Sequence, residues 1–232
     1  MKIYAIGDLH LSFGEGVDKP MNKFGPVWND HDRTLKENWT DEISNDDITV
    51  IAGDISWAMD REEAYPDLEW IHELPGRKVL FKGNHDLWWV GITKLNQLFD
   101  DISFVSSTCY TAGDVCLCGS RGWLCPGHDE FTEHDEKIYK RELLRVEASL
   151  KAAGDGREII GFLHYPPTND KFEESGFTEL FEKYGVKDVY YGHLHGKDAF
   201  KRGLKGELNG VNYHLVSLDY LDAKPLLIWE DK

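Results

Sequence analysis

The sequence predicts an α/β protein with mixed β-sheets, and three patterns lead to this fold class. Short continuous apolar runs, such as residues 48–52 and 159–163, are typical of strands that are covered on both faces. Amphipathic segments with helical periodicity lie between these runs. Two turn signals, Gly113-Asp114 and Asn209-Gly210, predict antiparallel hairpins in addition to the strands that alternate with helices.

Five of the predicted strands end abruptly in a polar motif. In open α/β sheets the carboxyl ends of the strands form the ligand site, so we expect these motifs to meet at one edge. Glycines within four of the motifs let the backbone turn sharply and approach a ligand closely. The motifs are Gly7-Asp8-Leu9-His10, Gly53-Asp54, Gly83-Asn84-His85-Asp86, His164 and Gly192-His193-Leu194-His195.

The segments between the strands predict helices. The segment 30–43 has an acidic start and places Leu35, Trp39 and Ile43 on one face. In the segment 61–73, Pro66 has to lie in the first turn or break the helix. Further helices are expected at residues 93–99, 136–153 and 178–184.

Other segments predict antiparallel strands. Residues 104–110 and 115–119 flank the first turn signal, and residues 205–208 and 211–217 flank the second. Residues 224–230 make a final strand. We expect residues 1–232 to form a single domain, in which residues 11–39 are a long insertion that faces the substrate or only packs.

Composition and charge restrict the partners. The content of 41% apolar and 29% charged residues is ordinary for a soluble globular protein, and no stretch suggests a signal peptide or a membrane span. A cytoplasmic protein without membrane contact is therefore expected. The net charge of −16 disfavours nucleic acid but permits a small phosphorylated substrate. Nothing in the sequence predicts the oligomeric state.

The four cysteines favour a structural role. In a chain without a signal peptide, reduced thiols that serve as small core side chains are the preferred interpretation. A zinc site made from three of them is the alternative. The four are Cys109, Cys116, Cys118 and Cys125.

The side chains of the polar motifs form a set of metal-binding groups. Asp8 and His10 are two residues apart, as are His193 and His195, so on an extended backbone each pair faces the same way. Mixed carboxylate, amide and imidazole groups suit Mn²⁺, Fe or Zn²⁺ better than Ca²⁺, which prefers oxygen alone.

These motifs resemble the full signature of the calcineurin-like metallophosphoesterase superfamily, in its order, from residue 7 to residue 196. The resemblance implies a four-layer α/β/β/α sandwich with two mixed sheets and two divalent metal ions. It implies that Asp54 bridges the metals, and that His85 lies near the substrate phosphate with Asp86 orienting it. One metal would be held by Asp8, His10 and His195, and the other by Asn84, His164 and His193.

The implied reaction is hydrolysis of a phosphoric ester. Two divalent cations opposite two carboxylates leave positive charge that lowers the pKa of a bridging water, and the resulting hydroxide attacks phosphorus in line. Leu87 stands where phosphoprotein phosphatases carry an arginine, and Trp57 stands where purple acid phosphatases carry a tyrosine ligand. A bacterial-type phosphohydrolase acting on a small phosphodiester or phosphomonoester is therefore preferred. A nuclease of the same superfamily and a non-catalytic metal-binding scaffold are the alternatives.

Three further residues are candidates for substrate contact. Arg121, after an apolar run, is suited to hold a phosphate oxygen, although a surface arginine is the simpler interpretation. Tyr165 either lines the pocket beside His164 or only packs. His31 either reaches the site from the 11–39 insertion or starts a helix at the surface.

Overall fold

Two β-sheets pack face to face at the centre of the computed structural model, which describes residues 1–231. The first sheet has the strand order β11-β1-β2-β3-β4 and the second the order β5-β6-β7-β8-β10-β9. The strands are β1 (Lys2–Ile6), β2 (Ile48–Ala52), β3 (Arg77–Phe81), β4 (Ile102–Val105), β5 (Cys109–Ala112), β6 (Val115–Ser120), β7 (Glu158–Leu163), β8 (Asp188–Tyr191), β9 (Gly206–Leu208), β10 (Val211–Leu215) and β11 (Leu226–Glu230).

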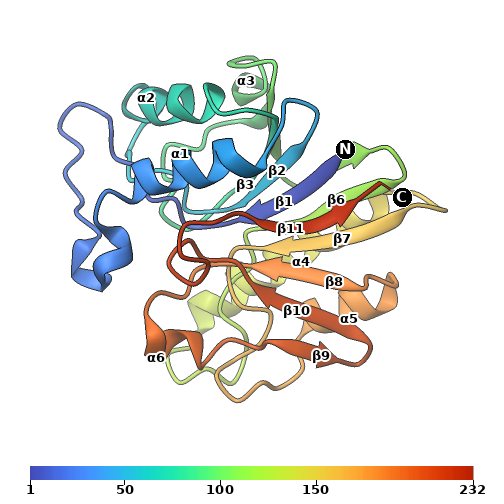
Figure 1. Cartoon of the computed structure of the whole chain (residues 1–232). Helices are drawn as coiled ribbons and strands as arrows, with labels where there is room; N and C mark the ends of the chain where they lie inside the picture. The colour runs from blue at the N-terminus through green and yellow to red at the C-terminus, as the bar shows by residue number, and fades with distance from the viewer. Residues whose placement is uncertain (232) are drawn as a thin grey trace.

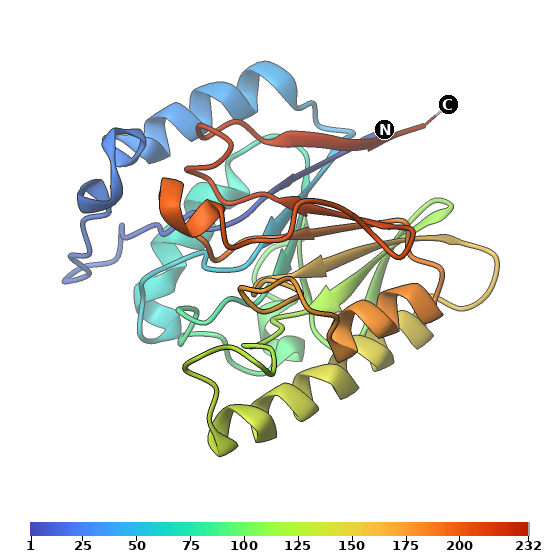
Figure 2. The same ribbon diagram turned by 90° about the horizontal axis from the view of Figure 1, so that it is seen from below.

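Helices cover the two outer faces, as Figures 1 and 2 show. The helices α1 and α2 bury apolar side chains such as Trp39 and Leu68 against the first sheet. The helices α4 and α5 bury Val146 and Phe181 against the second sheet. The helical elements are η1 (Asn22–Phe24), η2 (Pro26–Trp28), α1 (His31–Glu42), α2 (Arg61–His72), α3 (Ile92–Leu95), α4 (Glu133–Ala152), α5 (Gly176–Lys183) and α6 (Lys197–Phe200).

A third apolar cluster fills the space between the sheets. Phe81 of β3 and Phe162 of β7 stack across it with ring centroids 5.2 Å apart. Burial on both faces explains why the strands read as continuous apolar runs rather than as alternating patterns. The predicted α/β architecture with two mixed sheets is thereby confirmed.

The parallel strands bring their carboxyl ends to one edge. The strands β1 to β4 run parallel in the first sheet, and β6, β7, β8 and β10 run parallel in the second. The two sheets meet at Gly7, whose N–H donates to Val216 at 2.7 Å and whose carbonyl accepts from Leu218 at 3.0 Å. The segments that follow β1 and β10 therefore lie side by side.

The two hairpins form as predicted, but one predicted strand does not. Asn209 and Gly210 have φ angles of 52° and 79°, as the turn between β9 and β10 requires. The segment 104–110 is not one strand, because the chain leaves the first sheet after β4 and enters the second at β5. Ser107, with a φ of 58°, lies at this crossing. The apolar pattern of a segment predicts a strand but does not indicate which of the two sheets contains it.

Four helices differ from the expectation, one in the place of its proline and three in their boundaries. Pro66 lies in the second turn of α2 and does not break it, because the buried face of the helix holds it against the sheet. The helix α3 is shorter than predicted and ends at Leu95. The helices α4 and α5 begin earlier, at capping boxes formed by Thr132 with Asp135 and by Ser175 with Thr178.

The cysteines lie away from any metal-binding group among residues 1–231. Cys116, Cys118 and Cys125 are buried in the apolar cluster between the second sheet and its helices, and all four thiols are free. No group of side chains placed to hold a metal in this range includes a cysteine, so the alternative of a zinc site is not supported. Within the same range, no helix is long and apolar enough to cross a membrane.

Asp67 of α2 is a buried carboxylate that ties two loops to the helix. One of its oxygens accepts from the N–H of Phe13 at 2.7 Å, and the other accepts a short hydrogen bond from the hydroxyl of Ser56. Burial raises the pKa of Asp67 to about 6, although these hydrogen bonds oppose the shift. The ionised form is therefore less stable in the folded protein than in the unfolded chain.

We expect Asp67→Asn to change the pH dependence of stability. A carboxyl with a raised pKa contributes most to stability below its unfolded pKa, and this contribution falls as pH rises through about 6. The free energy of unfolding of the wild type should therefore fall relative to that of the variant, by about 1 kcal/mol between pH 5 and pH 7.5. Urea unfolding at both pH values measures this difference. Asp46→Asn, at an exposed position, is the control, and a difference that does not vary with pH would contradict the assignment.

Candidate metal centre

The five polar motifs meet at the carboxyl edge of the sheets. The structure divides their side chains into two groups, within each of which the nitrogen and oxygen atoms lie within 4.8 Å of one another. Asp8, His10 and His195 form the first group. Asp54, His164 and His193 form the second, and Asn84 adjoins it.

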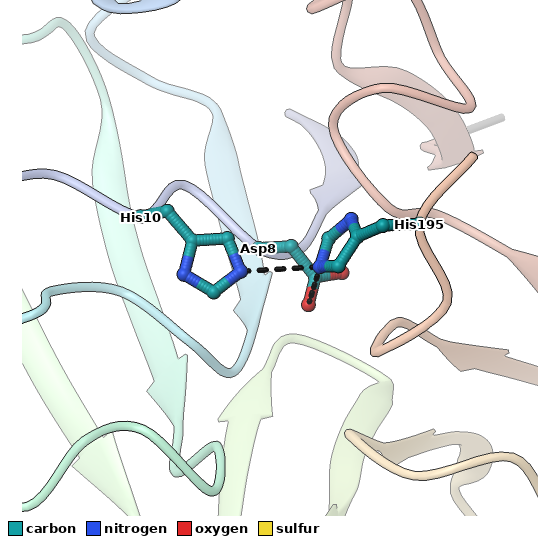
Figure 3. Close-up of side chains that lie close together, drawn as sticks. All are labelled: Asp8, His10 and His195. Carbon is teal, nitrogen blue, oxygen red and sulfur yellow. Dashed lines mark hydrogen bonds and ion pairs between the residues drawn. The ribbon is translucent and has the colours of Figure 1, made fainter. Parts of the chain in front are cut away.

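The first group joins the ends of β1 and β8 (Figure 3). The Nε2 atoms of His10 and His195 face each other at 3.1 Å, and Nε2 of His195 lies 3.6 Å from Oδ1 of Asp8. Both carboxylate oxygens of Asp8 also accept from the backbone N–H of His193, at 3.0 Å each. The carboxylate is thus held in place by the loop after β8, which carries His193 and His195.

The second group is centred on His164, at the end of β7. Its Nδ1 lies 3.0 Å from the carbonyl of Ala52, which fixes the ring. Its Nε2 lies 2.8 Å from Oδ1 of Asn84 and 3.2 Å from Nδ1 of His193. A carboxylate, an amide oxygen and two imidazoles therefore converge here, as the sequence predicts.

Asp54 connects the two groups. Its Oδ2 lies 3.3 Å from Nε2 of His164 and 3.8 Å from Nε2 of His10. Its Oδ1 accepts from the backbone N–H of His85 at 2.8 Å. One carboxylate oxygen thus faces both groups while the other anchors the loop that carries His85.

The backbone at these residues is not extended. Asp8, His10, Asp54 and His193 have φ angles of 60°, 47°, 49° and 74°, in the left-handed region. The expectation that an extended backbone aims each Asp/His or His/His pair at the site is therefore wrong. Such conformations cost about 1 kcal/mol or more each, and they cluster at functional sites where the surrounding structure imposes them.

Two glycines are required by close packing around these side chains. A Cβ atom on Gly192 would lie 2.4 Å from Oδ2 of Asp8. Gly53 has a φ of 88°, and a Cβ there would lie 2.6 Å from Nδ1 of His164. The glycines of the motifs therefore leave room for the carboxylate and imidazole groups.

The electrostatics show buried groups that compensate one another. Burial raises the pKa of Asp8 to about 6. Burial opposes ionisation of Asp54 as well, but the charge and hydrogen bond of His164 outweigh it and lower the pKa of Asp54. Burial disfavours the charged form of His164, yet the charge of Asp54 raises its pKa to about 9. Burial also lowers the pKa of His10 and His193, which favours the neutral imidazoles that bind metal ions.

These observations fit divalent metal ions. Two buried carboxylates need positive charge beside them, which divalent cations would supply. The facing imidazole nitrogens of His10 and His195 are a donor pair that suits a cation. The structure therefore agrees with the donor set inferred from the sequence.

Asp219 supports the first group and was missed in the sequence. Its Oδ1 lies 3.0 Å from Nδ1 of His195, and its Oδ2 accepts from the N–H of Gly196 at 2.9 Å. A carboxylate that fixes the far nitrogen of an imidazole is a common second partner in metal sites. Asp219 follows β10 at the same edge, so the strand-end pattern that located the other motifs also indicates this residue.

His85 and Asp86 do not interact as expected. The carboxylate of Asp86 accepts from the N–H groups of Gly83 at 2.7 Å, Ile55 at 2.9 Å and Ser56 at 3.2 Å, and from the indole of Trp88 at 3.2 Å. These bonds tie the loop after Asp54 to the loop after β3, so Asp86 positions backbone rather than the His85 ring. Burial lowers the pKa of His85.

Aromatic side chains lie between His85 and the first metal-binding group and beside that group. Its ring centroid lies 4.3 Å from that of Trp57, which in turn stacks on His10 at 4.6 Å. The 11–39 insertion adds Trp28, whose ring lies 5.4 Å from that of His195. Figure 1 shows this insertion at the end of the sheets where α6 lies. The insertion therefore forms one wall of the centre.

The three candidates for substrate contact lie in different surroundings. The guanidinium of Arg121 pairs with Glu142 at 3.2 Å and lies over Trp123, so it faces α4 rather than the centre. His31 begins α1, and its Nε2 lies 2.9 Å from the carbonyl of Leu9, which fixes the first motif. Tyr165 is buried, and its ring lies 4.1 Å from that of His193, beside the centre.

Comparison with known proteins identifies the family. The family model of calcineurin-like phosphoesterases matches residues 1–197. The chain belongs to this family, whose members hydrolyse phosphoesters with the help of divalent metals.

Two of the relatives are proteins of mycobacterial phages. The chain is 36% identical over 195 residues to the Gene 66 protein of Mycobacterium phage D29, covering 84% of this chain and 79% of that protein. It is 42% identical over 173 residues to the Gene 66 protein of Mycobacterium phage L5, covering 75% of this chain and 68% of that protein.

Two solved structures share the fold. A protein of unknown function from Aquifex aeolicus aligns with a TM-score of 0.51 at 18% identity, covering 97% of this chain and 94% of that one. A phosphopantetheinyl hydrolase from Mycobacterium tuberculosis aligns with a TM-score of 0.58 at 14% identity, covering 99% and 96%.

We expect Gly192→Ala to disturb the first group without unfolding the chain. The added Cβ would lie 2.4 Å from Oδ2 of Asp8 and displace this carboxylate. Because small displacements in a catalytic site cost up to about 100-fold in rate, phosphoesterase activity should fall at least tenfold, and the metal content should fall through loss of metal from the first group. Elemental analysis and an ester hydrolysis assay measure them. Gly91→Ala is the matched control, since a Cβ there meets no atom within 4 Å. Equal metal content in both variants would contradict the assignment.

Proposed function

We propose that this protein is a phosphoesterase with a dinuclear metal centre. Asp8, His10 and His195 hold one metal, while Asn84, His164 and His193 hold the other. Asp54 bridges them. The observation that carries the proposal is the position of Asp54, whose Oδ2 lies within 3.8 Å of a histidine nitrogen of each group. The imidazole, amide and carboxylate groups suit Mn²⁺, Fe or Zn²⁺.

Different residues of the site have different roles in the proposed reaction. Bound divalent metals supply the positive charge that attracts the phosphate and activates water for attack on phosphorus. His85 stands beside both groups, tied through its N–H to Asp54, and contacts the phosphate or the leaving oxygen. Asp219 orients His195, and Asp86 holds the loops in place. Trp28, which is buried, and Trp57, which is partly buried, lie beside His10 and limit the access of bulk water.

The substrate is a small phosphorylated molecule rather than a nucleic acid. The net charge of −16 repels a long polyanion, whereas the metal centre offers local positive charge. The 11–39 insertion contributes one wall, in which Phe24 lies 6.1 Å from the ring of His195 and is partly exposed. Residues of this insertion therefore face the substrate.

Hydrolysis of bis(p-nitrophenyl) phosphate and p-nitrophenyl phosphate tests the proposal. The wild-type protein loaded with Mn²⁺ should contain close to two metals per chain and hydrolyse the diester. Asp54→Asn should lower kcat at least 100-fold and reduce the metal content, because the bridging charge is lost. His85→Ala should lower kcat by about 100-fold while retaining the metals, because this residue acts on the substrate.

A matched histidine variant serves as the control. His214→Ala removes a ring that pairs with Asp188 on the second sheet, away from the centre, and should keep both metals and activity. Two bound metals without hydrolysis of either ester would contradict the enzymatic proposal and favour a metal-binding scaffold. One metal per chain in the wild type would contradict the dinuclear assignment.

A further inference from the structure

Three of the four cysteines lie on one face of the hairpin that β5 and β6 form. Cys109 stands opposite Cys118 in the antiparallel pairing of these strands. Further along the hairpin, Thr111 stands opposite Cys116. Because successive residues of a strand point to opposite faces, these two pairs share a face. This face packs into the apolar cluster between the second sheet and its helices.

The turn of the hairpin determines how close the opposed residues are. The strands are joined by a two-residue loop, Gly113-Asp114, in which Gly113 has a φ of 59°. The residues that flank such a loop are a hydrogen-bonded pair, and pairs with and without hydrogen bonds alternate from there along the hairpin. Cys109 and Cys118 are therefore a pair without hydrogen bonds, whose Cα atoms lie about 4.5 Å apart. A disulfide needs a Cα separation of about 4.4–6.8 Å, so the two can be bridged.

The side chains on this face agree with the close spacing. The Oγ1 atom of Thr111 and the Sγ atom of Cys116, which form the next pair of the same kind, lie 3.7 Å apart. Burial raises the pKa of the Cys118 thiol, and the charge of Cys109 raises this pKa further, as expected for neighbouring sulfurs. Burial and the charge of Cys109 also raise the pKa of Cys116, so Cys109 adjoins both buried thiols.

The backbone separation favours Cys118 over Cys116 as the partner of Cys109. Cys116 is the diagonal neighbour of Cys109, and the Cα atoms of diagonal neighbours lie about 7–8 Å apart. Cysteines whose Cα atoms are more than about 7 Å apart cannot be joined unless the backbone moves. The directly opposed pair requires no such movement.

The pair of Cys109 and Cys118 is accessible from one side. The strand β5 is at the edge of the second sheet, and Cys109 is partly exposed, whereas Cys118 is completely buried. A buried thiol with a raised pKa reacts slowly with a dissolved oxidant, because little of its thiolate is present. A small oxidant therefore meets Cys109 first, and Cys118 is placed to attack the oxidised sulfur from within the protein.

We propose that Cys109 and Cys118 form a reversible disulfide when the protein meets hydrogen peroxide. The thiol of Cys109 loses its proton, and the thiolate attacks one peroxide oxygen. The O–O bond breaks, Cys109 becomes a sulfenic acid, and the released hydroxide takes up the proton to form water. The Cys118 sulfur then attacks the Cys109 sulfur, and the S–O bond breaks. The departing hydroxide takes the proton of Cys118 and leaves as a second water. Two thiols are thus oxidised while one peroxide is reduced to two waters.

The disulfide would join an edge strand covalently to the strand that supports the metal centre. The chain enters the second sheet at β5, and β6 leads to Arg121, whose carbonyl accepts from the N–H of His164 at 3.0 Å. No side chain of the two metal-binding groups takes part in the bond. The redox chemistry of this pair is therefore independent of the proposed phosphoesterase function.

Peptide mapping of the oxidised protein detects the bond. Cleavage before Asp114 and after Arg121 separates Cys109 from the other two cysteines of the hairpin. The reduced protein is treated with hydrogen peroxide and then alkylated with iodoacetamide in denaturant. The four alkylated thiols should fall to two, and residues 101–113 should be joined to residues 114–121. Dithiothreitol should restore all four. Four alkylated thiols after peroxide treatment, or a loss that dithiothreitol does not reverse, would overturn the proposal.

Alanine variants identify the partner of Cys109. Cys109→Ala and Cys118→Ala should each contain at least about tenfold less of the linked peptide than the wild type. Cys116→Ala is the matched control, because Cys116 is buried on the same strand and face, and it should retain the bond. Thermal unfolding checks that the variants are folded, and Cys109→Ala keeps the test decisive if Cys118→Ala does not fold. A link between Cys109 and Cys116 in folded Cys118→Ala, at the level of the wild-type link, would contradict the assigned pair. Loss of the bond in Cys116→Ala would contradict it as well.

Discussion

The closeness of two buried carboxylates, Asp8 and Asp54, is the constraint on which the rest of the site depends. Both are almost completely removed from solvent, and the charge of Asp54 opposes ionisation of Asp8. Such a pair persists only with positive charge or protons beside it. Histidines at the ends of three strands lie beside this carboxylate pair, and His164 lies nearest to Asp54. Divalent metals would meet the same need more completely, and this shared requirement links the fold to the proposed chemistry.

A second layer of acidic side chains holds the loops that carry these groups. The carboxylate of Asp86 accepts hydrogen bonds from the N–H of Ile55, in the loop that follows Asp54, and from the N–H of Gly83, in the loop that carries His85. Asp67 fixes the loop after Asp54 and the start of the 11–39 insertion, and Asp219 fixes His195. The bonds to Ile55 and Ser56 hold the residues that directly follow Asp54, whose backbone has a left-handed φ of 49°. The loops that carry the site are thus held by hydrogen bonds within the protein.

The sequence predicts the architecture and the place of the site well, because both follow from strand ends. A buried parallel strand is recognised in the sequence as a continuous apolar run. A polar residue at its carboxyl end lies at the same edge of the sheet as the polar residues that end the neighbouring parallel strands. Details that depend on contacts distant in sequence are not predicted in this way. The partners of Asp86 are backbone groups, which no side-chain pattern reveals. The turn of Arg121 towards Glu142 depends on where α4 packs. The chain passes from the first sheet to the second at Ser107, and the hydrophobic pattern of the sequence does not predict this crossing.

The most direct test of the account is a crystal structure of the Mn²⁺-loaded protein with anomalous diffraction data. The account predicts two manganese ions at this edge of the sheets, one beside Asp8 and His195 and the other beside His164 and His193, with a carboxylate oxygen of Asp54 between them. A single ion at this edge would contradict the dinuclear centre. Ions bound instead at His72, Asp100 and Asp101, where three side chains also lie close together, would contradict the assignment of the site.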